Sequence, residues 1–554
     1  MKIIKYILAV SFFLLLASGC SDYLDVKPEN QLVIEDFWKK GSDVEAVVRS
    51  CYRSMEEPDF MWRVGVWGEL RSDNVITNTS SGSDEKQIDN VNIVSTNVNC
   101  NWKSFYTVIN LCNTVLKYAP DVMNRDPNFR TPDLQAKEAE VYAIRALCYF
   151  YLVRTFRNVP FSSEATVSDN QDLLIKQSKP DSILNVITND LLKAESWALD
   201  VYPTTPETKG RMTKDAIRAI LADVYLWKSA TDTAAFEKAN DYSNCITYCD
   251  KLINATKDEF DYNGNVVKVP KYELIKENAS NSIFSDGVSI SSGGYTFSSY
   301  GVGNSSESIF ELQFSSDVRD IGIYSVNDVA TSGTYYTHHG LFGSCYTATT
   351  DYADPAQEIV FPKTDTRRTD FIKYPKSSSG FYQIWKYMGS YISSKTDPYV
   401  SNTVSNWIFY RITDVMLMKA EALVQQGGDT DLKQALHLVN TTYTRSNVAP
   451  ADTLVFNNYS NVPAMEKLVL LERQRELMFE GKRWFDLVRN AERKQSTNDL
   501  VGYVLNKYSS NLSTITTKLS VMNGLYLPIF ENELIANPNL KQNPYYEVSS
   551  TIVK

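Results

Sequence analysis

Apolar side chains recur every three or four residues along much of the chain, and this spacing predicts α-helices. In the clearest stretch, residues 133–156, the apolar positions include Val141, Ile144 and Leu147. The same spacing predicts four antiparallel helix pairs, which cover residues 41–52 with 99–118, 133–156 with 181–199, 217–230 with 234–253, and 411–426 with 431–445. Asp181 is placed to cap the start of the fourth helix.

Four helix pairs predict a mainly α fold with a tetratricopeptide-like scaffold of helical hairpins. The small side chains Ala216, Ala219 and Ala222 would let two of these helices approach closely. The spacing between the pairs is far from a constant repeat of about 34 residues. The pattern therefore supports helical hairpins more than a strict repeat.

The helical pattern stops in residues 257–406, which we interpret as an insertion. Ser, Gly and Asn are frequent there, and short β-like runs such as 308–314 and 381–388 interrupt them. A long insertion of this kind inside a compact domain is usually functional or disordered. Disordered segments are normally poor in aromatic residues, whereas aromatic residues are interleaved through this one, so the composition favours a function.

The first nineteen residues have the layout of a secretory signal peptide: a positive start, an apolar run over 6–17, and small residues before Cys20. The stretch LLLASGC resembles a bacterial lipobox, in which the cysteine is lipidated, although Ala17 stands where that pattern prefers the leucine found at Leu16. We predict a lipid anchor on Cys20; the alternative is an ordinary secreted protein in which Cys20 has no such role. After residue 20 no apolar run approaches eighteen residues, so we do not expect a membrane-spanning helix.

Charge and residue counts exclude several classes of function. The formal net charge of −10 argues against a nucleic-acid partner, because phosphate neutralisation needs clustered Lys and Arg. The chain has only three histidines, which leaves little for a zinc site or a histidine-dependent nucleophile. We expect no cofactor and no metal. Seven cysteines follow Cys20 without a CxxC pair, and buried free thiols are the favoured interpretation.

Six segments in a fixed order resemble the SusD/RagB family, the surface lipoproteins of bacterial glycan- and peptide-uptake systems. They follow an acidic mature start, CSDYLDVKPENQLVIEDFW, which is similar to the family's export tether. The segments are GELRSDNV (68–75), AEVYAIRALCYFYLVRTFRNVP (139–160), AIRAILADVYLW (216–227), FYRITDVMLMKAEAL (409–423), LLERQRELMFEGKRWFDLVRNA (470–491) and LPIFENELIANPNLKQNPYY (527–546).

The resemblance implies an organisation and a partner. It implies a signal peptide over 1–19, a lipid-anchored tether over 20–38, and a SusD-like domain over 39–554, with a helical scaffold (39–256 and 407–546) that carries the ligand-binding insertion (257–406). It also implies a SusC-like TonB-dependent transporter, over which the lipoprotein acts as a lid. Asp22 and Asp25 resemble the family's signal for export to the cell surface, which places the protein on the outer face of the outer membrane.

One group of charged residues resembles a catalytic site. Glu472, Glu476 and Glu480 are spaced to share one helical face, with Arg475 and Arg483 beside them. A glycosidase needs one carboxyl group with a raised pKa, whereas nearby arginines lower the pKa of a carboxyl group. We therefore interpret the cluster as structural ion pairs, and we expect no enzyme activity.

Binding candidates should be aromatic, lie on loops, and lie outside the family's scaffold segments, because sugars pair flat C–H patches with hydroxyl groups. By the same criterion Trp102, Trp227, Trp407 and Trp484 are expected to pack in the core. The polar segment 78–90, predicted as a loop, supplies hydrogen-bonding groups. The candidates, each of which could instead serve packing or partner contact, are Trp62, Asn78, Tyr295, Tyr300, Tyr335 and Tyr336.

The sequence hypothesis is a non-catalytic receptor that captures oligosaccharides and delivers them to its transporter. Three alternatives stay open: a RagB-like receptor for peptides, an enzyme, and a purely structural lid without ligand affinity.

Overall fold

The computed structural model describes the chain from residue 37 to residue 547, with gaps. The described ranges are 37–78, 81–168, 170–231, 235–262, 264–275, 289–290, 295–296, 303–314, 346–348, 359–373, 383–384, 386, 390–391, 406–447 and 453–547. Cys20 and nearly all of the predicted tether lie outside these ranges.

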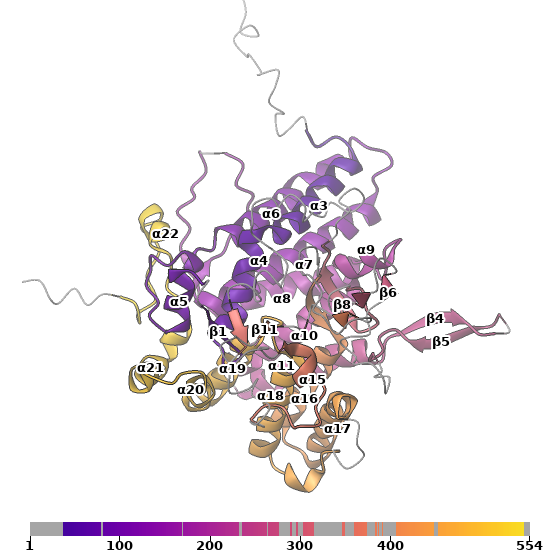
Figure 1. Cartoon of the computed structure of the whole chain (residues 1–554). Helices are drawn as coiled ribbons and strands as arrows, with labels where there is room; N and C mark the ends of the chain where they lie inside the picture. The colour runs from indigo at the N-terminus through magenta and orange to yellow at the C-terminus, as the bar shows by residue number, and fades with distance from the viewer. Residues whose placement is uncertain are drawn as a thin grey trace, which may run out of the picture.

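A continuous row of helices forms the body of the protein (Figure 1). Each helix packs against the next one named: α3 (Gly41–Glu56), α6 (Lys103–Val122), α7 (Thr131–Phe156), α8 (Pro180–Trp197), α10 (Lys214–Thr231), α11 (Ala235–Ile253), α16 (Ile412–Gln426) and α17 (Asp429–Ser446). The insertion separates α11 from α16 in sequence, yet these two helices contact each other directly. The mainly α fold is confirmed, and the row is consistent with a tetratricopeptide-like scaffold.

The helix ends follow from local chemistry. The side chain of Asp133 accepts a hydrogen bond from the backbone N–H of Arg130 at 3.0 Å, which starts α7 with a capping box. The prediction that Asp181 caps the start of α8 was wrong, because Lys179 occupies the N-cap position. Asp181 lies in the first turn instead, where a negative charge still interacts favourably with the helix dipole.

The middle of the row is buried on every side. From Ala139 to Phe156 almost every side chain of α7 is buried, because α6, α3 and α8 all pack against this helix. A helix covered in this way needs no polar face, which explains its near-continuous apolar sequence. Six cysteines of the described ranges are buried as free thiols, in agreement with the sequence interpretation.

Further helices complete the body. In the first half of the chain these are α4 (Pro58–Gly65), the π-helix η1 (Val66–Leu70), α5 (Ser83–Asp89) and α9 (Thr205–Gly210). Near the C-terminus these are α18 (Val462–Leu477), α19 (Arg483–Lys494), α20 (Asn498–Leu505), α21 (Leu512–Leu519) and α22 (Glu531–Ala536). α18 packs on α16 and α17, and α19 packs on α10 and η1.

Two buried strands hold the insertion on the scaffold. β8 (Ser308–Leu312) pairs antiparallel with β13 (Trp407–Arg411), and every residue of both strands is buried. The rings of Phe310 and Phe409 stack at 5.5 Å between centroids. The strand predicted over 308–314 is confirmed, whereas the one predicted over 381–388 is described only as β11 (Gln383–Ile384).

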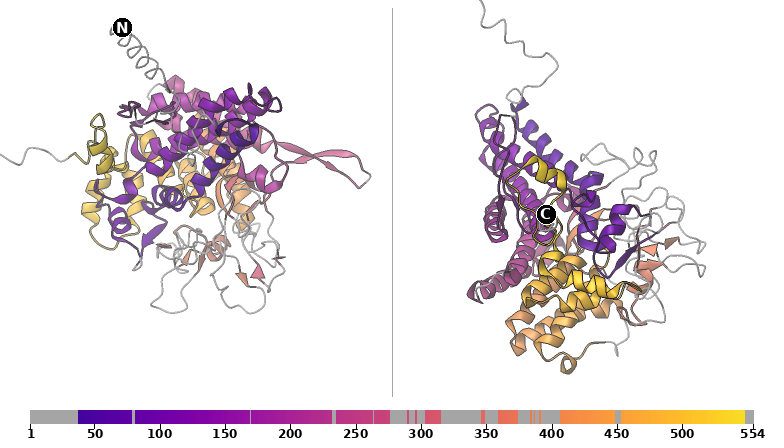
Figure 2. Two further views of the ribbon diagram at one scale, coloured as in Figure 1. Left: turned by 90° about the horizontal axis from the view of Figure 1, so that it is seen from above. Right: turned by 90° about the vertical axis from the view of Figure 1, so that its left-hand side faces the viewer.

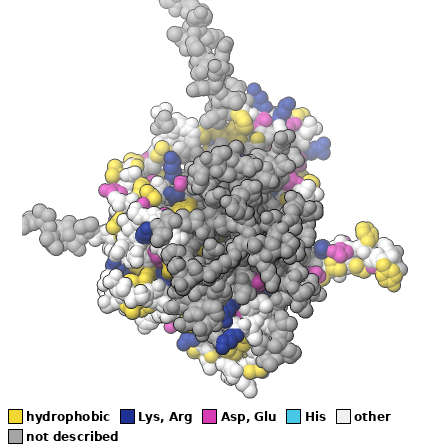
Figure 3. Space-filling model, in the orientation of Figure 1, with side chains coloured by type: hydrophobic (Ala, Val, Ile, Leu, Met, Phe, Trp, Pro, Cys, Tyr) yellow, Lys and Arg dark blue, Asp and Glu magenta, His cyan; other side chains and the backbone are white. Residues whose placement is uncertain are grey.

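A hairpin projects from the body at the start of the insertion (Figures 1 and 2). It consists of β4 (Thr256–Phe260) and β5 (Val266–Pro270), which pair antiparallel. Figure 3 shows hydrophobic side chains at its tip, where Phe260 is 78% exposed and Tyr262 is 97% exposed. The hairpin is therefore one of the few described places where large aromatic side chains face solvent.

The conspicuous carboxylates lie in a buried ion-pair network. Arg367 contacts Glu472 at 2.8 Å and Glu476 at 2.9 Å, and Arg411 contacts Glu476 at 2.6 Å and Glu480 at 2.8 Å. Arg445 also pairs with Glu476. The neighbouring arginines hold the pKa of Glu476 well below its usual range, although burial alone would raise it.

The network confirms structural ion pairs but corrects their details. Glu480 lies beyond the end of α18, so the three carboxylates do not share one helical face. Arg475 lies 3.6 Å from Glu472, and Arg483 pairs with Asp73 at 2.8 Å. The cations that neutralise the carboxylates come mainly from distant parts of the chain, which helical spacing cannot predict.

A close backbone contact joins the two ends of the chain. A Cβ atom added at Gly68 would come within 1.8 Å of the carbonyl oxygen of Gly481. Gly481 itself has φ +69°, a left-handed conformation that favours glycine. Both positions therefore require glycine.

We expect Arg411→Met to destabilise the protein by about 3–5 kcal/mol, because it leaves the buried carboxylates of Glu476 and Glu480 short of a cation. Urea unfolding followed by circular dichroism measures this. The control is Lys433→Met, which breaks an exposed pair with Asp429 and should cost less than about 1 kcal/mol. Equal small losses in both variants would contradict a structural role for the network.

Candidate functional site

A small sheet joins the two regions that the sequence predicts as the ligand face. β1 (Val75–Thr77) pairs antiparallel with β9 (Tyr346–Ala348), so that Val75 lies opposite Ala348 and Thr77 opposite Tyr346. β1 leads directly into the polar segment that begins at Asn78, and β9 belongs to the insertion. The fold therefore places that polar segment beside the insertion, although about 270 residues separate them in sequence.

Trp62 lies in helix α4, which corrects the expectation that this candidate lies on a loop, and it is partly buried against the core. Its indole N–H donates a hydrogen bond to Oδ1 of Asn99 at 2.9 Å. The side-chain amide of Asn99 in turn donates to Oε1 of Glu85 in α5 at 3.0 Å. Trp62 is thus fixed in orientation and linked to the polar segment, a position that serves packing and could also present one ring face.

The polar segment 78–90 contains a helix, which corrects the prediction of a loop. α5 starts after Gly82, its first turn carries Asp84 and Glu85, and Ile88 is buried. Acidic residues in a first turn favour helix formation through the helix dipole. A hydrophobic pattern only seven residues long is too short to show helical periodicity.

Several polar groups of this segment are used inside the fold. Oδ2 of Asp89 accepts hydrogen bonds from the backbone N–H and the hydroxyl of Thr77, at 2.9 and 2.8 Å. Asn97 donates to Oε1 of Gln87 at 3.0 Å. The backbone N–H of Asn78 donates to the hydroxyl of Ser81 at 3.0 Å. These bonds shape the segment and reduce the number of groups that it can offer to a ligand.

Tyr295 is the one predicted tyrosine that falls on a described element. It begins β7 (Tyr295–Thr296), which lies between β6 (Ser289–Ile290) and β12 (Ser390–Tyr391) in a three-stranded antiparallel sheet. The predicted residues Tyr300, Tyr335 and Tyr336 lie outside the described residues, as does the predicted lipidation site Cys20.

The four tryptophans predicted to pack in the core do so. Trp102, Trp227, Trp407 and Trp484 are each at most 3% exposed. Among the described residues, no three or more His, Cys, Asp or Glu side chains are grouped so as to hold a metal ion. Within the same part of the chain, every helix is too short or too polar to span a membrane.

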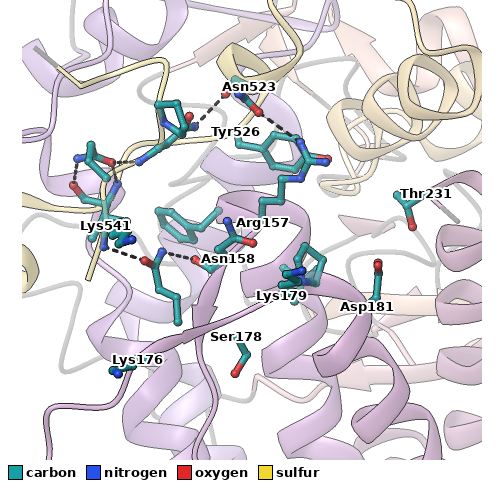
Figure 4. A pocket seen from close by; sticks show the side chains of 18 of the residues that line it. Arg157, Asn158, Lys176, Ser178, Lys179, Asp181, Thr231, Asn523, Tyr526 and Lys541 are labelled. Atoms are coloured by element: carbon teal, nitrogen blue, oxygen red, sulfur yellow. Dashed lines mark hydrogen bonds between the residues drawn. The ribbon is translucent and has the colours of Figure 1, made fainter. Parts of the chain in front are cut away.

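A cavity of about 930 Å³ opens elsewhere in the fold (Figure 4). Its walls come from the ends of α7 and α10, the start of α8, and the C-terminal segment after α21; none of its lining residues belongs to α4, to segment 78–90 or to the insertion. The sequence analysis missed it because its polar residues are scattered over four regions and form no motif. Only the fold brings them together.

Comparison with known proteins places this architecture in a family. A model described as the SusD family matches residues 372–546, and one described as "Starch-binding associating with outer membrane" matches residues 22–226. The chain belongs to the SusD/RagB family. A SusD-like protein of Formosa agariphila is 25% identical over 580 residues, which cover 97% of this chain and 99% of the relative. A SusD-like protein of Bacteroides ovatus is 21% identical over 513 residues and covers 87% of this chain and 82% of the relative.

Solved structures show the same SusD fold. A SusD superfamily protein from Bacteroides vulgatus superposes with a TM-score of 0.68 at 19% identity, covering 92% of this chain and 100% of that one. A SusD homolog from Bacteroides thetaiotaomicron gives a TM-score of 0.64 at 21% identity, with coverage of 92% and 100%.

In this SusD-family chain, the segment GELRSDNV supports the base of β1. The carboxylate of Glu69 accepts hydrogen bonds from Nδ2 of Asn74 at 2.7 Å and from the backbone N–H groups of Phe479 and Gly481 at 3.2 and 3.1 Å. Arg71 donates to the carbonyl oxygens of residues 524 and 525. The segment thus links the predicted ligand face to the C-terminal part of the SusD scaffold.

Burial raises the pKa of Glu69 from 4.5 to about 7, although its hydrogen bonds lower it. The folded protein then binds one more proton than the unfolded chain between these two pH values. The contribution of protonated Glu69 to the free energy of unfolding is complete below pH 4.5 and is lost as the pH rises through about 7.

We therefore expect the stability of the wild type, relative to Glu69→Gln, to fall by on the order of 3 kcal/mol between pH 4.5 and pH 8. Urea titrations at several pH values measure the difference. Glu531→Gln, at an exposed position, serves as the control and should show no such trend. A pH-independent difference for Glu69→Gln would mean that Glu69 titrates at its ordinary pKa.

Proposed function

We propose that this SusD-family protein captures oligosaccharides on the face formed by Trp62, segment 78–90 and the insertion. The observation that carries the proposal is the pairing of β1 with β9, which brings the polar segment beside the insertion. The matching family description, "Starch-binding associating with outer membrane", supports a glycan as the ligand. Asn78, Tyr295, Tyr300, Tyr335 and Tyr336 are the further residues that we assign to this face.

The protein holds its ligand without changing it. The carboxylates that could resemble a glycosidase pair, Glu472 and Glu476, are fully buried and paired with arginines. A general acid for glycoside cleavage needs a raised pKa and access to the scissile bond, and Glu476 has neither. This supports a binding protein rather than an enzyme.

The proposed receptor works beside a transporter at the outer membrane. In this proposal residues 1–19 are removed as a signal peptide, lipid on Cys20 holds the chain at the outer face of the membrane, and residues 20–38 form a tether. The SusD-like domain, residues 39–554, then acts as a lid over a SusC-like TonB-dependent transporter. The continuous packing of the helix row supports this role, because a lid must move as one body.

Isothermal titration calorimetry against a panel of neutral glycans tests the ligand class. We expect saturable binding of at least one glycan, weakened at least tenfold when Tyr295, Tyr300, Tyr335 and Tyr336 are replaced by Ala, because stacking on aromatic faces is lost. Tyr262→Ala is the control: it lies at the exposed tip of the β4–β5 hairpin, which projects from the body and which we do not assign to the ligand face, so this variant should bind as the wild type does.

Binding of peptides without binding of any glycan would overturn the proposal in favour of a RagB-like peptide receptor. Retention of full glycan affinity in the fourfold Tyr→Ala variant would place the ligand elsewhere on the molecule.

Cys20→Ala tests the anchor. We expect the wild type to carry acyl mass on its mature N-terminus, measured by mass spectrometry, and the variant to lack this mass and to leave the outer-membrane fraction, because stable anchoring needs more than one acyl chain. Unchanged membrane association of Cys20→Ala would contradict lipid anchoring through this residue.

A further inference from the structure

The cavity of Figure 4 has walls that are already fixed by hydrogen bonds. On one side Nε2 of Gln177 donates to the carbonyl oxygen of Asn158 at 2.9 Å, and the backbone N–H of Lys541 donates to Oε1 of Gln177 at 2.8 Å. On another side Arg157 donates to Oδ1 of Asn523 at 3.2 Å. A preformed wall lowers the entropy cost of binding a ligand.

Four cations surround the cavity. Arg157 lies at the end of α7, Lys176 precedes β3 (Gln177–Ser178), Lys179 is the N-cap residue of α8, and Lys541 lies in the C-terminal segment. Lys176, Lys179 and Lys541 are exposed and form no ion pair within the described part of the chain. Figure 4 shows their side chains around one opening, although they come from separate parts of the sequence.

Three acidic residues also line the cavity, but they do not cancel this charge. Glu492 is only 4% exposed, and its Oε1 accepts a hydrogen bond from the hydroxyl of Tyr526 at 2.7 Å. Asp181 lies in the first turn of α8, where it faces the positive end of the helix dipole. With Glu547 included, the lining still carries one more positive than negative group.

The remaining lining suits a sugar. Asn158 and Ser178 offer an amide and a hydroxyl group, and the largely buried aromatic side chains Phe156 and Tyr526 also line the cavity. Polar groups over a small apolar floor match the mixed surface of a sugar ring. A volume of about 930 Å³ lies within the range found for small-molecule sites.

We propose that this cavity is a second binding site, which takes a saccharide bearing carboxylate or sulfate groups. The proposal rests on the proposed function in so far as the ligand is a saccharide. Lysine ammonium groups act as point charges without a fixed pairing geometry, so that Lys176, Lys179 and Lys541 accept either anionic group. Such a site would let the protein select charged chains independently of its neutral ligand face.

Titration calorimetry with defined probes tests the second site on the full mature protein. The probes are tetragalacturonate, a chondroitin sulfate tetrasaccharide, inorganic sulfate, and maltoheptaose as the neutral reference. We expect saturable binding of at least one anionic tetrasaccharide, which weakens at least tenfold between 50 and 300 mM NaCl because exposed charges are screened.

The variant Lys176→Gln/Lys179→Gln/Lys541→Gln should lose at least tenfold in affinity for that tetrasaccharide. The control replaces three other exposed lysines, Lys40, Lys103 and Lys467, by Gln and removes the same net charge, so its affinity should stay within twofold of the wild type. Replacing the three cavity lysines by Arg should retain binding, because the charges remain. Circular dichroism and a thermal melt establish that each variant is folded.

Three outcomes would overturn the proposal: no binding of either anionic tetrasaccharide, equal losses in the cavity and control variants, or inorganic sulfate binding as tightly as the sulfated tetrasaccharide. The failure is distinguishable from that of the proposed function. Neutral glycan binding, and its loss in the fourfold Tyr→Ala variant, should be unaffected by the lysine replacements at the cavity.

Discussion

The structure depends on one buried cluster of charges near the end of α18. Glu472, Glu476 and Glu480 are desolvated, and each would be strongly destabilising without a cation beside it. The cations are supplied by Arg367 and Arg411 together with Lys386 and Arg445, which belong to the insertion, to β13 and to α17. Because no single element can complete the cluster, folding of the helical row and docking of the insertion become one cooperative event. A chain with only some of these partners in place would leave a buried charge unpaired.

This ion-pair network explains how the long insertion is held at fixed positions on the helical scaffold. Charged residues from three places in the insertion, Glu307, Arg367 and Lys386, enter the same network, and β8 and β13 are buried against the helices. The parts of the insertion that carry these charged residues are thus part of the core, whereas the residues that contact a ligand can vary in the segments between them. The family segments are also part of this core, because Glu69 and Asp73 of GELRSDNV, and Arg483 of segment 470–491, all have buried structural partners. A motif that identifies the family is here mostly a motif of the scaffold, which is why it says little about the ligand.

The sequence was sufficient for the helices and insufficient for the sites, for physical reasons. Periodicity located α11, which buries apolar side chains at steps of three and four, whereas α7 and α16 are buried almost throughout and are recognisable by their length and high apolar content. Periodicity missed α5, which is stabilised by hydrogen bonds from Asn97 and Asn99 in the following segment rather than by a long apolar stripe. The ion-pair partners of Glu472, Glu476 and Glu480 were harder to predict than the helices. Helical spacing suggested Arg475 and Arg483, whereas tertiary contacts supply Arg367 and Arg411. The cavity lay beyond any sequence argument, because Lys176 and Lys541 line it together only where the C-terminal segment is hydrogen-bonded to the side chain of Gln177.

The hydrogen bonds between GELRSDNV and the C-terminal part of the chain also constrain when, relative to synthesis, this part of the fold can form. Hydrogen bonds join Glu69 to Phe479 and Arg71 to the carbonyl oxygen of Leu525, over sequence separations of 410 and 454 residues. Contacts of such length slow folding, since a large loop must close before they form. At a synthesis rate of roughly 5–20 residues per second, the N-terminal helices wait on the order of tens of seconds for these partners. The native contacts of GELRSDNV are therefore completed only after synthesis has passed Leu525.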